Sequence, residues 1–125
     1  ITVNGCFIVG LDGQTKSVFD DIFNFVKEAE LYEVQITILT PFPGTELYDR
    51  LKKANRLIEP TNWKTCTLFD LNFRPLELSE EELREGFHGL AMRLYSDDFT
   101  QWRRDTFKKN LRNGFRDWKN EEKCA

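Results

Sequence analysis

Histidine and cysteine are scarce in this chain of 125 residues, which contains one histidine, His88, and three cysteines, Cys6, Cys66 and Cys124. The cysteines lie about 60 residues apart, so no pair has the close spacing of a metal site. An odd, sparse count also argues against a disulfide framework and favours reduced thiols in a cytoplasmic protein. A nucleophile would find only one histidine as its base, without a supporting motif. We therefore expect neither a metal site nor catalytic residues within these residues.

Long hydrophobic runs are also missing. No apolar run approaches the roughly 20 residues that span a bilayer, and the longest, residues 5–11, is typical of a buried strand. The sequence has no signal peptide pattern and starts at Ile1 with strand-like residues. We therefore expect a cytoplasmic chain without a membrane span, cut from a longer protein.

The net charge of −3 is unevenly distributed. Residues 1–50 carry 3 basic and 8 acidic side chains, whereas residues 101–125 carry 8 basic and 4 acidic ones. A basic tail can indicate nucleic-acid binding. Here the acidic residues are interspersed among the basic ones, as on a solvated helix face, so we expect no nucleic-acid partner.

A strand, a helix and a second strand are predicted in the first 40 residues. Residues 2–11 and 34–40 are apolar and β-branched, as in strands buried within a parallel sheet. Between them, apolar residues recur at helical spacing after Ser17, the expected N-cap. This pattern predicts one βαβ unit with parallel strands and a right-handed crossover. The unit is too small to be a stable domain alone, and no comparable third strand follows.

The remainder is predicted to be mainly helical. Residues 41–44, Pro-Phe-Pro-Gly, form a rigid turn, and Thr45 caps a short helix. Residues 68–73 are a candidate short strand. Ser79 and Glu82 match a capping box at the start of another helix.

A last helix is expected to begin at Asp97 or Asp98 and to end at Asn113-Gly114. Within it, Arg103-Arg104 could contact an anionic group, although exposed or ion-paired arginines are the simpler interpretation. His88 lies between Gly86 and Gly89, where close helix packing explains the glycines better than a ligand does.

Strand alternation locates the candidate site. Gln35, Thr37 and Leu39 share one face of the second strand, and Ile36 and Ile38 share the other. The purely apolar face should lie under helices, and the mixed face should line a barrel interior where ligands bind near the carboxyl ends of strands. Gln35 and Thr37 could equally satisfy one another in a filled interior, so two interpretations remain open.

The sequence resembles one enzyme family along nearly its whole length. Residues 4–15, NGCFIVGLDGQT, and residues 35–51, QITILTPFPGTELYDRL, resemble the last two barrel strands of radical S-adenosylmethionine enzymes, in the subgroup with an N-terminal cobalamin-binding domain. Residues 55–64, NRLIEPTNWK, and residues 78–96, LSEEELREGFHGLAMRLYS, together with the later WRR, resemble the small helical domain that follows that barrel.

The resemblance implies an α/β fragment, consisting of one βαβ unit from a partial (βα)6 barrel followed by a mainly helical region. The expected division is residues 1–56 and residues 57–125. In that family a CxxxCxxC loop holds a [4Fe–4S] cluster that reductively cleaves S-adenosylmethionine. This chain lacks the loop, so it should bind no cofactor and be inactive alone. The parent would carry the cluster, S-adenosylmethionine and, if the cobalamin-binding domain is present, cobalamin.

The same resemblance implies particular site residues. Ile8 and Gly10 match positions of the family motif GxIxGxxE, which approaches the adenine, whereas Cys6 and Gly13 replace its first glycine and its acidic residue. Leu39 and Thr40 would border the same adenosyl pocket. Gln35 and Thr37, deeper on the interior face, would point toward substrate.

The reaction implied for the parent is radical methylation or hydrogen abstraction, as in related methyltransferases and cyclases. The expected partners are the upstream barrel and the cobalamin-binding domain. As an isolated fragment, the chain is expected to form a homodimer through its bare strand edges, unless its C-terminal helices fold back to give a compact monomer. The alternative function is a helical protein-interaction module without catalytic activity.

Overall fold

A parallel two-stranded sheet and its crossover helix form the N-terminal part of the molecule. The computed structural model describes residues 1–124, with β1 (Asn4–Val9), α1 (Ser17–Glu28) and β2 (Glu33–Ile38) in this order. The strands pair in parallel, with Asn4 opposite Glu33 and Val9 opposite Ile38. The predicted α/β fold class and βαβ unit are confirmed.

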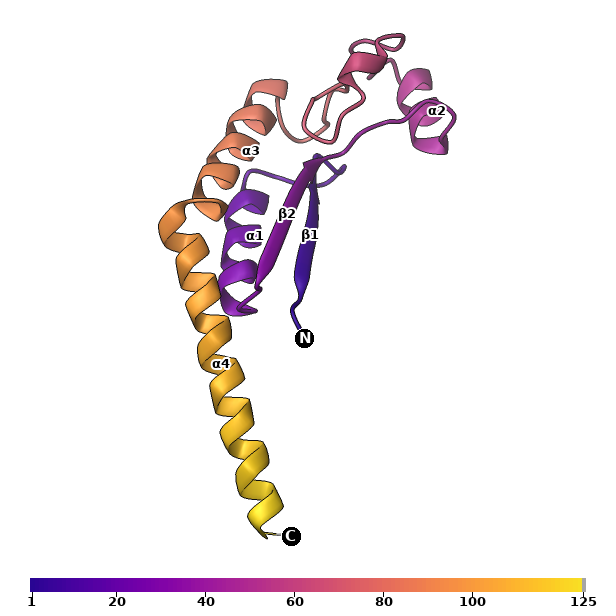
Figure 1. The fold of residues 1–125 in the computed structure, drawn as a ribbon. Coiled ribbons are helices and arrows are strands. Elements are labelled where there is room, and N and C mark those ends of the chain that lie inside the picture. The colour runs from indigo at the N-terminus through magenta and orange to yellow at the C-terminus, as the bar shows by residue number, and fades with distance from the viewer. Residues whose placement is uncertain (125) are drawn as a thin grey trace.

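Helices make up most of the remainder. They are α2 (Glu46–Lys53), a 3-10 helix (Trp63–Thr65), α3 (Glu80–Leu94) and α4 (Asp97–Cys124). Figure 1 shows α1, α3 and α4 on the same side of the strands, with α2 and its neighbouring loops beyond the carboxyl ends of the strands. Over residues 1–124, no helix has the length and apolar character needed to cross a membrane.

Two helix starts follow the sequence signals. Thr45 Oγ1 accepts a hydrogen bond from the Tyr48 amide at 3.3 Å. Ser79 Oγ accepts from the Glu82 amide at 3.1 Å, and the Glu82 carboxylate accepts from the Ser79 amide at 2.8 Å. These bonds satisfy amides that have no partner within their own helix, so the predicted caps are confirmed.

The predicted N-cap of α1 is wrong. Lys16, with φ −55° and ψ −25°, already has helical geometry and holds the N-cap position without a side-chain bond. The Val18 amide donates to the Thr15 carbonyl at 3.0 Å, so the chain enters the helix through a turn that starts before Ser17. The Ser17 hydroxyl lies 3.2 Å from the Thr15 hydroxyl instead.

Two other boundaries differ from expectation. Helix α4 continues to Cys124 rather than ending at Asn113-Gly114. Gly114 does not have a positive φ, so it does not adopt the left-handed geometry that ends many helices. Residues 68–73 form no strand; a single antiparallel bridge joins Leu57 and Phe73.

The core lies between the sheet and the helices. Phe19, Ile22 and Val26 of α1 are buried, as are Val34, Ile36 and Ile38 of β2 and Leu83, Leu90 and Leu94 of α3. Full burial of each such side chain contributes about 1.5–3 kcal/mol relative to exposure. The purely apolar strand face therefore lies under helices, as the alternation predicts.

Helix α3 packs closely on α1 at Gly86. A Cβ atom at Gly86 would overlap the ring of Phe19, whereas one at Gly89 would meet nothing within 4 Å. His88 is exposed between them. Close packing therefore explains Gly86, as expected from the sequence, but it does not explain Gly89.

Candidate functional site

Within the described residues, the mixed face of the sheet is uncovered. Cys6 and Ile8 of β1 lie beside Gln35 and Thr37 of β2. Leu39 directly follows β2 and is partly buried against the core. We call these four strand side chains, together with Leu39 at their border, the open face. Ile8, the fifth of the six residues of β1, is 48% exposed. The structure thus brings together three predicted site residues, Ile8, Gln35 and Thr37, with Leu39 next to them in the chain.

Polar contacts on the open face run across the strands. The Thr37 hydroxyl donates to the Phe7 carbonyl at 3.4 Å, and the Cys6 thiol lies 3.9 Å from Gln35 Oε1. Gln35 and Thr37 therefore do not satisfy one another, as one of the two interpretations required. Among the described residues, the side-chain nitrogen of the exposed Gln35 has no hydrogen-bond partner.

The other two predicted residues point elsewhere. Gly10 is buried with φ +95°, and a Cβ atom there would lie 2.9 Å from the Phe73 ring. Thr40 is buried on the helix side, where its hydroxyl lies 2.7 Å from the Thr67 carbonyl and 3.0 Å from the Ile38 carbonyl. The alternation of side chains between the two faces of β1 ends at Gly10, because only a residue without a side chain fits this positive-φ conformation beside Phe73.

Gln14 determines the shape of the loop that follows β1. Its side-chain carbonyl accepts hydrogen bonds from the amides of Gly10 at 2.8 Å and Leu11 at 3.0 Å. Its side-chain nitrogen donates to the Ile8 carbonyl at 3.2 Å. One side chain therefore makes backbone-like hydrogen bonds to β1 at the end next to the open face.

An ion pair joins this loop to the segment after α2. Arg56 Nη2 lies 2.7 Å from Asp12 Oδ1, and Nη1 lies 3.2 Å from Oδ2. Arg56 Nε also donates to the Arg74 carbonyl at 2.8 Å. The hydrogen bonds and charge of Arg56 lower the pKa of Asp12 below its ordinary value of 3.8. Asp12 is therefore a structural anion rather than a proton donor near neutral pH.

The open face has the chemistry of a binding surface. Ile8 and Leu39 offer apolar area, and Gln35 and Thr37 offer hydrogen-bonding groups beside it. No group of three potential metal ligands occurs among the described residues, and the described cysteines, Cys6 and Cys66, are free. Within the part of the chain that the structure describes, this surface thus combines apolar area with hydrogen-bonding groups and contains no cluster of metal ligands.

A cleft of about 590 Å³ lies between α1, α3 and α4. Its lining includes Phe23, Met92, Phe99 and Trp102, with Lys27 and Arg93 beside them. The rings of Phe99 and Trp102 stack at 5.3 Å, and Arg93 lies over Phe23 at 4.0 Å from its centroid. The cleft is lined entirely by helices and by the turn between α3 and α4, so it is separate from the open face.

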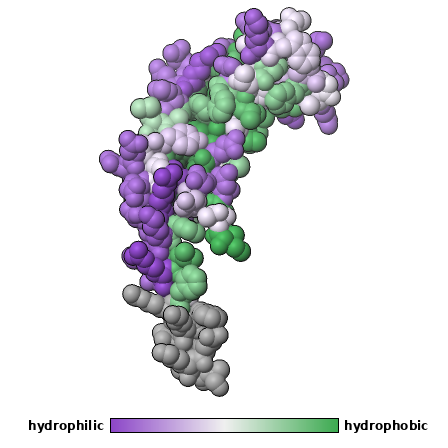
Figure 2. Space-filling model, viewed as in Figure 1, coloured by the Kyte–Doolittle hydropathy of each residue, from purple (hydrophilic) through white to green (hydrophobic). Residues whose placement is uncertain are grey.

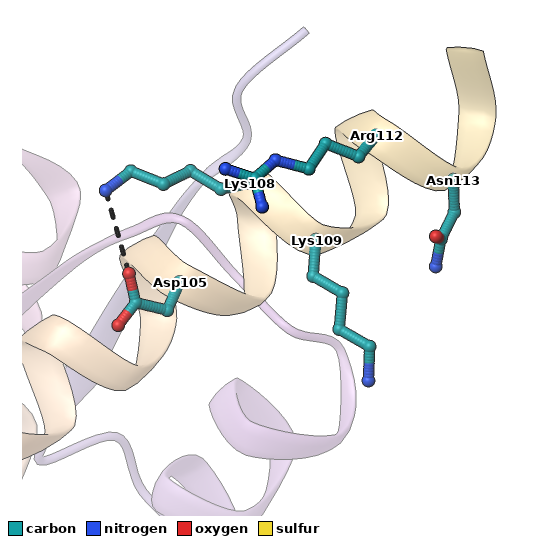
Figure 3. Close-up of a pocket in the computed structure, with 5 residues that line it drawn as sticks. All are labelled: Asp105, Lys108, Lys109, Arg112 and Asn113. Carbon is teal, nitrogen blue, oxygen red and sulfur yellow. Dashed lines mark ion pairs between the residues drawn. The ribbon is translucent and has the colours of Figure 1, made fainter. Parts of the chain in front are cut away.

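A second hollow, of about 460 Å³, lies along α4 (Figure 3). Its lining residues, Asp105, Lys108, Lys109, Arg112 and Asn113, all belong to this helix, and Lys108 Nζ lies 3.6 Å from Asp105. Because the described lining comes from this one helix, the hollow has the character of the solvated helix face predicted from the sequence.

Arg103 contradicts the simpler interpretation of its arginine pair. It is 3% exposed, and it donates to the carbonyls of Tyr32 at 2.9 Å and Leu94 at 3.2 Å. Arg104 is exposed, as expected. The buried guanidinium joins α4 to the turn before β2 through carbonyl groups, which no local sequence pattern indicates.

Gln14 and Tyr95 also went unrecognised in the sequence. The Tyr95 hydroxyl lies 3.3 Å from both the Ile36 amide nitrogen and the Val34 carbonyl. Gln14 had a weak local signal, a glutamine directly after the Asp-Gly turn. Tyr95 had none, because its partners lie about 60 residues earlier in the chain.

The chain is therefore an α/β protein that consists of a parallel βαβ unit and a helical extension, with one exposed strand face. The family described as "Domain of unknown function (DUF4070)" matches residues 45–124, and the chain belongs to this family. The match covers α2, α3 and α4 and begins directly after the Pro-Phe-Pro-Gly turn.

Three curated relatives are methyltransferases by name. Bacteriochlorophyllide d C-12(1)-methyltransferase of Chlorobaculum tepidum is 28% identical over 95 residues, which cover 76% of this chain and 20% of that protein. An uncharacterized methyltransferase of Pyrococcus horikoshii is 30% identical, with 63% of this chain and 17% of that protein covered. One of Synechocystis sp. is 32% identical, with 71% and 18% covered. The chain thus spans about a fifth of the length of these relatives.

Proposed function

We propose that this chain is part of a radical S-adenosylmethionine methyltransferase and forms one wall of its adenosyl pocket. The open face carries this proposal, because it adjoins the carboxyl ends of two parallel strands, where α/β proteins bind their ligands. The similarity to three methyltransferases supports methyl transfer as the reaction class.

The open face fits an adenosyl group in part. Ile8 and Leu39 offer apolar side chains that suit a planar base. The Gly10 amide is already bound to Gln14 and the Thr40 hydroxyl to backbone carbonyls, so these two residues shape the wall rather than supply free donors. Gln35, whose side-chain nitrogen is available, would face the substrate.

The cluster would be held by residues outside this chain. When bound, a [4Fe–4S] cluster supplies the electron that cleaves S-adenosylmethionine. The described residues contain no group of three potential ligands to hold it. We accordingly propose that the chain alone is inactive, that upstream domains of the parent hold the cluster and cobalamin, and that the enzyme is cytoplasmic.

Substitution of Ile8 in the parent tests the pocket assignment. Ile8→Asp should weaken S-adenosylmethionine binding by at least tenfold, because bound adenine would bury a desolvated carboxylate that has no counter-charge. Calorimetry on the full-length protein measures the affinity. Leu76→Asp, which introduces the same charge at an exposed leucine in the loop before α3, is the matched control. Equal affinity in wild type and the folded Ile8 variant would remove Ile8 from the site.

Cluster assembly gives a separate test. Anaerobic reconstitution with iron and sulfide, followed by optical and electron paramagnetic resonance spectra, should give a [4Fe–4S] signal in the full-length protein and none in the 125-residue chain. A stoichiometric cluster in the short chain would contradict the assignment of the ligands to upstream sequence.

The cleft between α1, α3 and α4 favours a second candidate, a helical protein-interaction module. Met92 is exposed at the cleft and Trp102 is half-buried there, so an apolar segment of a partner could dock. The gene sequence separates the two candidates. An upstream CxxxCxxC motif in the same reading frame supports the enzyme, and a reading frame that starts near Ile1 supports the module.

A further inference from the structure

A short antiparallel ladder in the C-terminal region lies against the loop that follows β1. Leu57 and Phe73 form its single β-bridge, and both side chains are buried. On one side of this bridge, the Arg74 amide donates to the Arg56 carbonyl at 2.8 Å. We call the two paired segments the brace; they are residues 56–59 and residues 72–74.

Asn72 joins the two segments of the brace from inside. Its own carbonyl accepts a hydrogen bond from the Ile58 amide at 3.1 Å. Its buried side chain accepts from the Glu59 amide at 2.9 Å and donates to the Glu59 carbonyl at 3.3 Å. A buried side chain whose polar groups are satisfied in this way makes the structure around it rigid. The brace can therefore serve as a fixed support.

The brace contacts the loop after β1 at two points. At the first, the buried ring of Phe73 lies beside Gly10, so close that a Cβ atom on Gly10 would be 2.9 Å from it. At the second, Arg56 donates to the Asp12 carboxylate at 2.7 and 3.2 Å. Arg56 Nε donates to the Arg74 carbonyl, within the brace, at 2.8 Å. The guanidinium is thus bound to the brace on one side and to the loop on the other.

The conformation of the loop explains why it needs contacts from outside. Gly10 and Gly13 have φ values of +95° and +89°, a region that favours glycine. Glycine loses more conformational freedom on folding than any other residue, so ordering this loop is unfavourable. Leu11, between the two glycines, is 45% exposed and adds little burial of its own. Contacts from the brace, one on each side of Leu11, offset the entropy lost.

We propose that Arg56 and Phe73 are positioning residues for S-adenosylmethionine, because the brace holds the loop after β1 in the form that binds the adenosyl group. The inference rests on the proposed function, in which Ile8 lines the adenosyl pocket and Gly10 shapes its wall. Arg56 and Phe73 act through the loop and do not touch the ligand. A wall that is ordered before binding loses less entropy when the ligand arrives, so the brace raises affinity. This gives residues 45–124, the segment matched by the family, a role in ligand binding.

A charge swap in the full-length protein tests Arg56. Arg56→Asp and Asp12→Arg should each weaken S-adenosylmethionine binding by at least about fivefold, and the double variant should return to within about twofold of wild type. Calorimetry measures the affinities. Recovery in the swapped pair separates an effect of the ion pair from a direct contact between Asp12 and the ligand. Arg93→Met, which breaks the ion pair of Arg93 with Asp20, is the matched control and should keep wild-type affinity.

Hydrogen exchange in the same variants tests whether the loop transmits the effect. The amides of Gly10 and Leu11 are bound to Gln14, so mass spectrometry should find residues 10–14 protected in wild type. Arg56→Asp should speed exchange in this segment by about tenfold through local opening. The swapped pair should restore the protection, and Arg93→Met should leave it unchanged.

Phe73→Leu tests the second contact. The smaller side chain leaves space beside Gly10 and should weaken S-adenosylmethionine binding by about threefold, with faster exchange over residues 10–14. The substitution also opens a cavity in the core, so a control for lost stability is needed. Leu90→Ala removes a buried side chain of α3 about two turns beyond Leu83, the residue of that helix beside Gly10. It should leave both measurements unchanged in the folded protein.

Two results would overturn the inference. One is wild-type affinity in the folded Arg56→Asp variant. The other is weaker binding without faster exchange over residues 10–14 or without recovery in the swapped pair, because Arg56 would then act by another route. A wild-type protein without affinity for S-adenosylmethionine would instead refute the proposed function. Exchange over residues 10–14 would then decide by itself whether the brace holds the loop.

Discussion

Arg56 donates hydrogen bonds from both terminal nitrogens to the carboxylate of Asp12, at 2.7 Å from Nη2 and 3.2 Å from Nη1. The pair joins the loop after β1 to the segment after α2. The two residues are 44 positions apart in the sequence. A two-pronged arginine–carboxylate pair fixes geometry as well as charge. The pair thus holds one border of the open face in place, although neither residue belongs to that face.

The pair should make stability depend on acid pH. The pKa of Asp12 lies below 3.8 in the folded chain because of Arg56. An aspartate with a lowered folded pKa stabilises the fold above its unfolded pKa, and this contribution is lost as pH falls through the folded value. Urea unfolding should show that Asp12→Asn costs about 0.5–1 kcal/mol at pH 7, a surface-pair magnitude, and much less at pH 2–3.

Asp21→Asn is the matched control for this titration, because Asp21 is an exposed carboxylate on α1. It should change the free energy of unfolding little at either pH. If Asp12→Asn and wild type lose stability in parallel between pH 5 and pH 2, the ion pair is not a source of the acid sensitivity.

Two glycines on α3 should respond oppositely to alanine. Gly86→Ala places a Cβ atom against the buried ring of Phe19 and should destabilise the chain by about 1–3 kcal/mol through overpacking. Gly89→Ala meets open space and should stabilise the chain by about 0.5–1 kcal/mol through helix propensity. Thermal unfolding of both variants provides the measurement. A stable Gly86 variant would show that α3 does not pack this closely on α1.

Adjacent arginines provide a second contrast. Arg103→Met would leave the carbonyls of Tyr32 and Leu94 without their donor. Loss of these charge-assisted bonds should cost about 1.5–3 kcal/mol. Arg104→Met, at an exposed position, should stay within about 0.5 kcal/mol of wild type. Similar effects of the two substitutions in urea unfolding would argue against the buried role of Arg103.

Self-association of the isolated chain should use the edge of β1 that faces away from β2. Light scattering under reducing conditions at about 100 µM, well above the µM range at which exposed edges associate, should give a dimer mass. Cys6→Pro removes an outward amide donor without removing a bond to β2 and should give a monomer. Cys6→Ser retains the amide and should still dimerise. A wild-type monomer would instead support a compact chain without free pairing capacity.

Local patterns predicted much of the fold. Strand alternation placed Ile36 and Ile38 under the helices and Gln35 and Thr37 on the opposite face, because side-chain direction follows from the backbone period alone. The capping box at Ser79 was equally local. The predicted division at residues 56 and 57 and the predicted binding roles stay predictions.

The errors arose where one local signal had an equally good local alternative. Ser17 is a favourable cap, but the turn at Thr15 starts the helix earlier. Gly114 can end a helix only in the left-handed conformation, and a glycine also fits the helix interior at a cost of about 1 kcal/mol. Composition cannot distinguish these outcomes.

Contacts across the chain could not be predicted at all. The hydroxyl of Tyr95 and the guanidinium of Arg103 bind backbone carbonyls of residues more than 60 positions earlier. Every residue has a backbone carbonyl, so the identity of the accepting residue gives no sign that it is the partner. The contacts that Tyr95 and Arg103 make at and before β2 can therefore be seen only in the folded chain.

The position of Tyr95 also has a consequence for synthesis of the chain. Ile36 is made 59 residues before the tyrosine that covers its amide. At about 5–20 residues per second, roughly 3–12 s pass between the synthesis of Ile36 and the synthesis of Tyr95. During this interval the strand edge is a temporary target for mispairing with other nascent chains, and a slower rate of translation would lengthen the exposure in proportion.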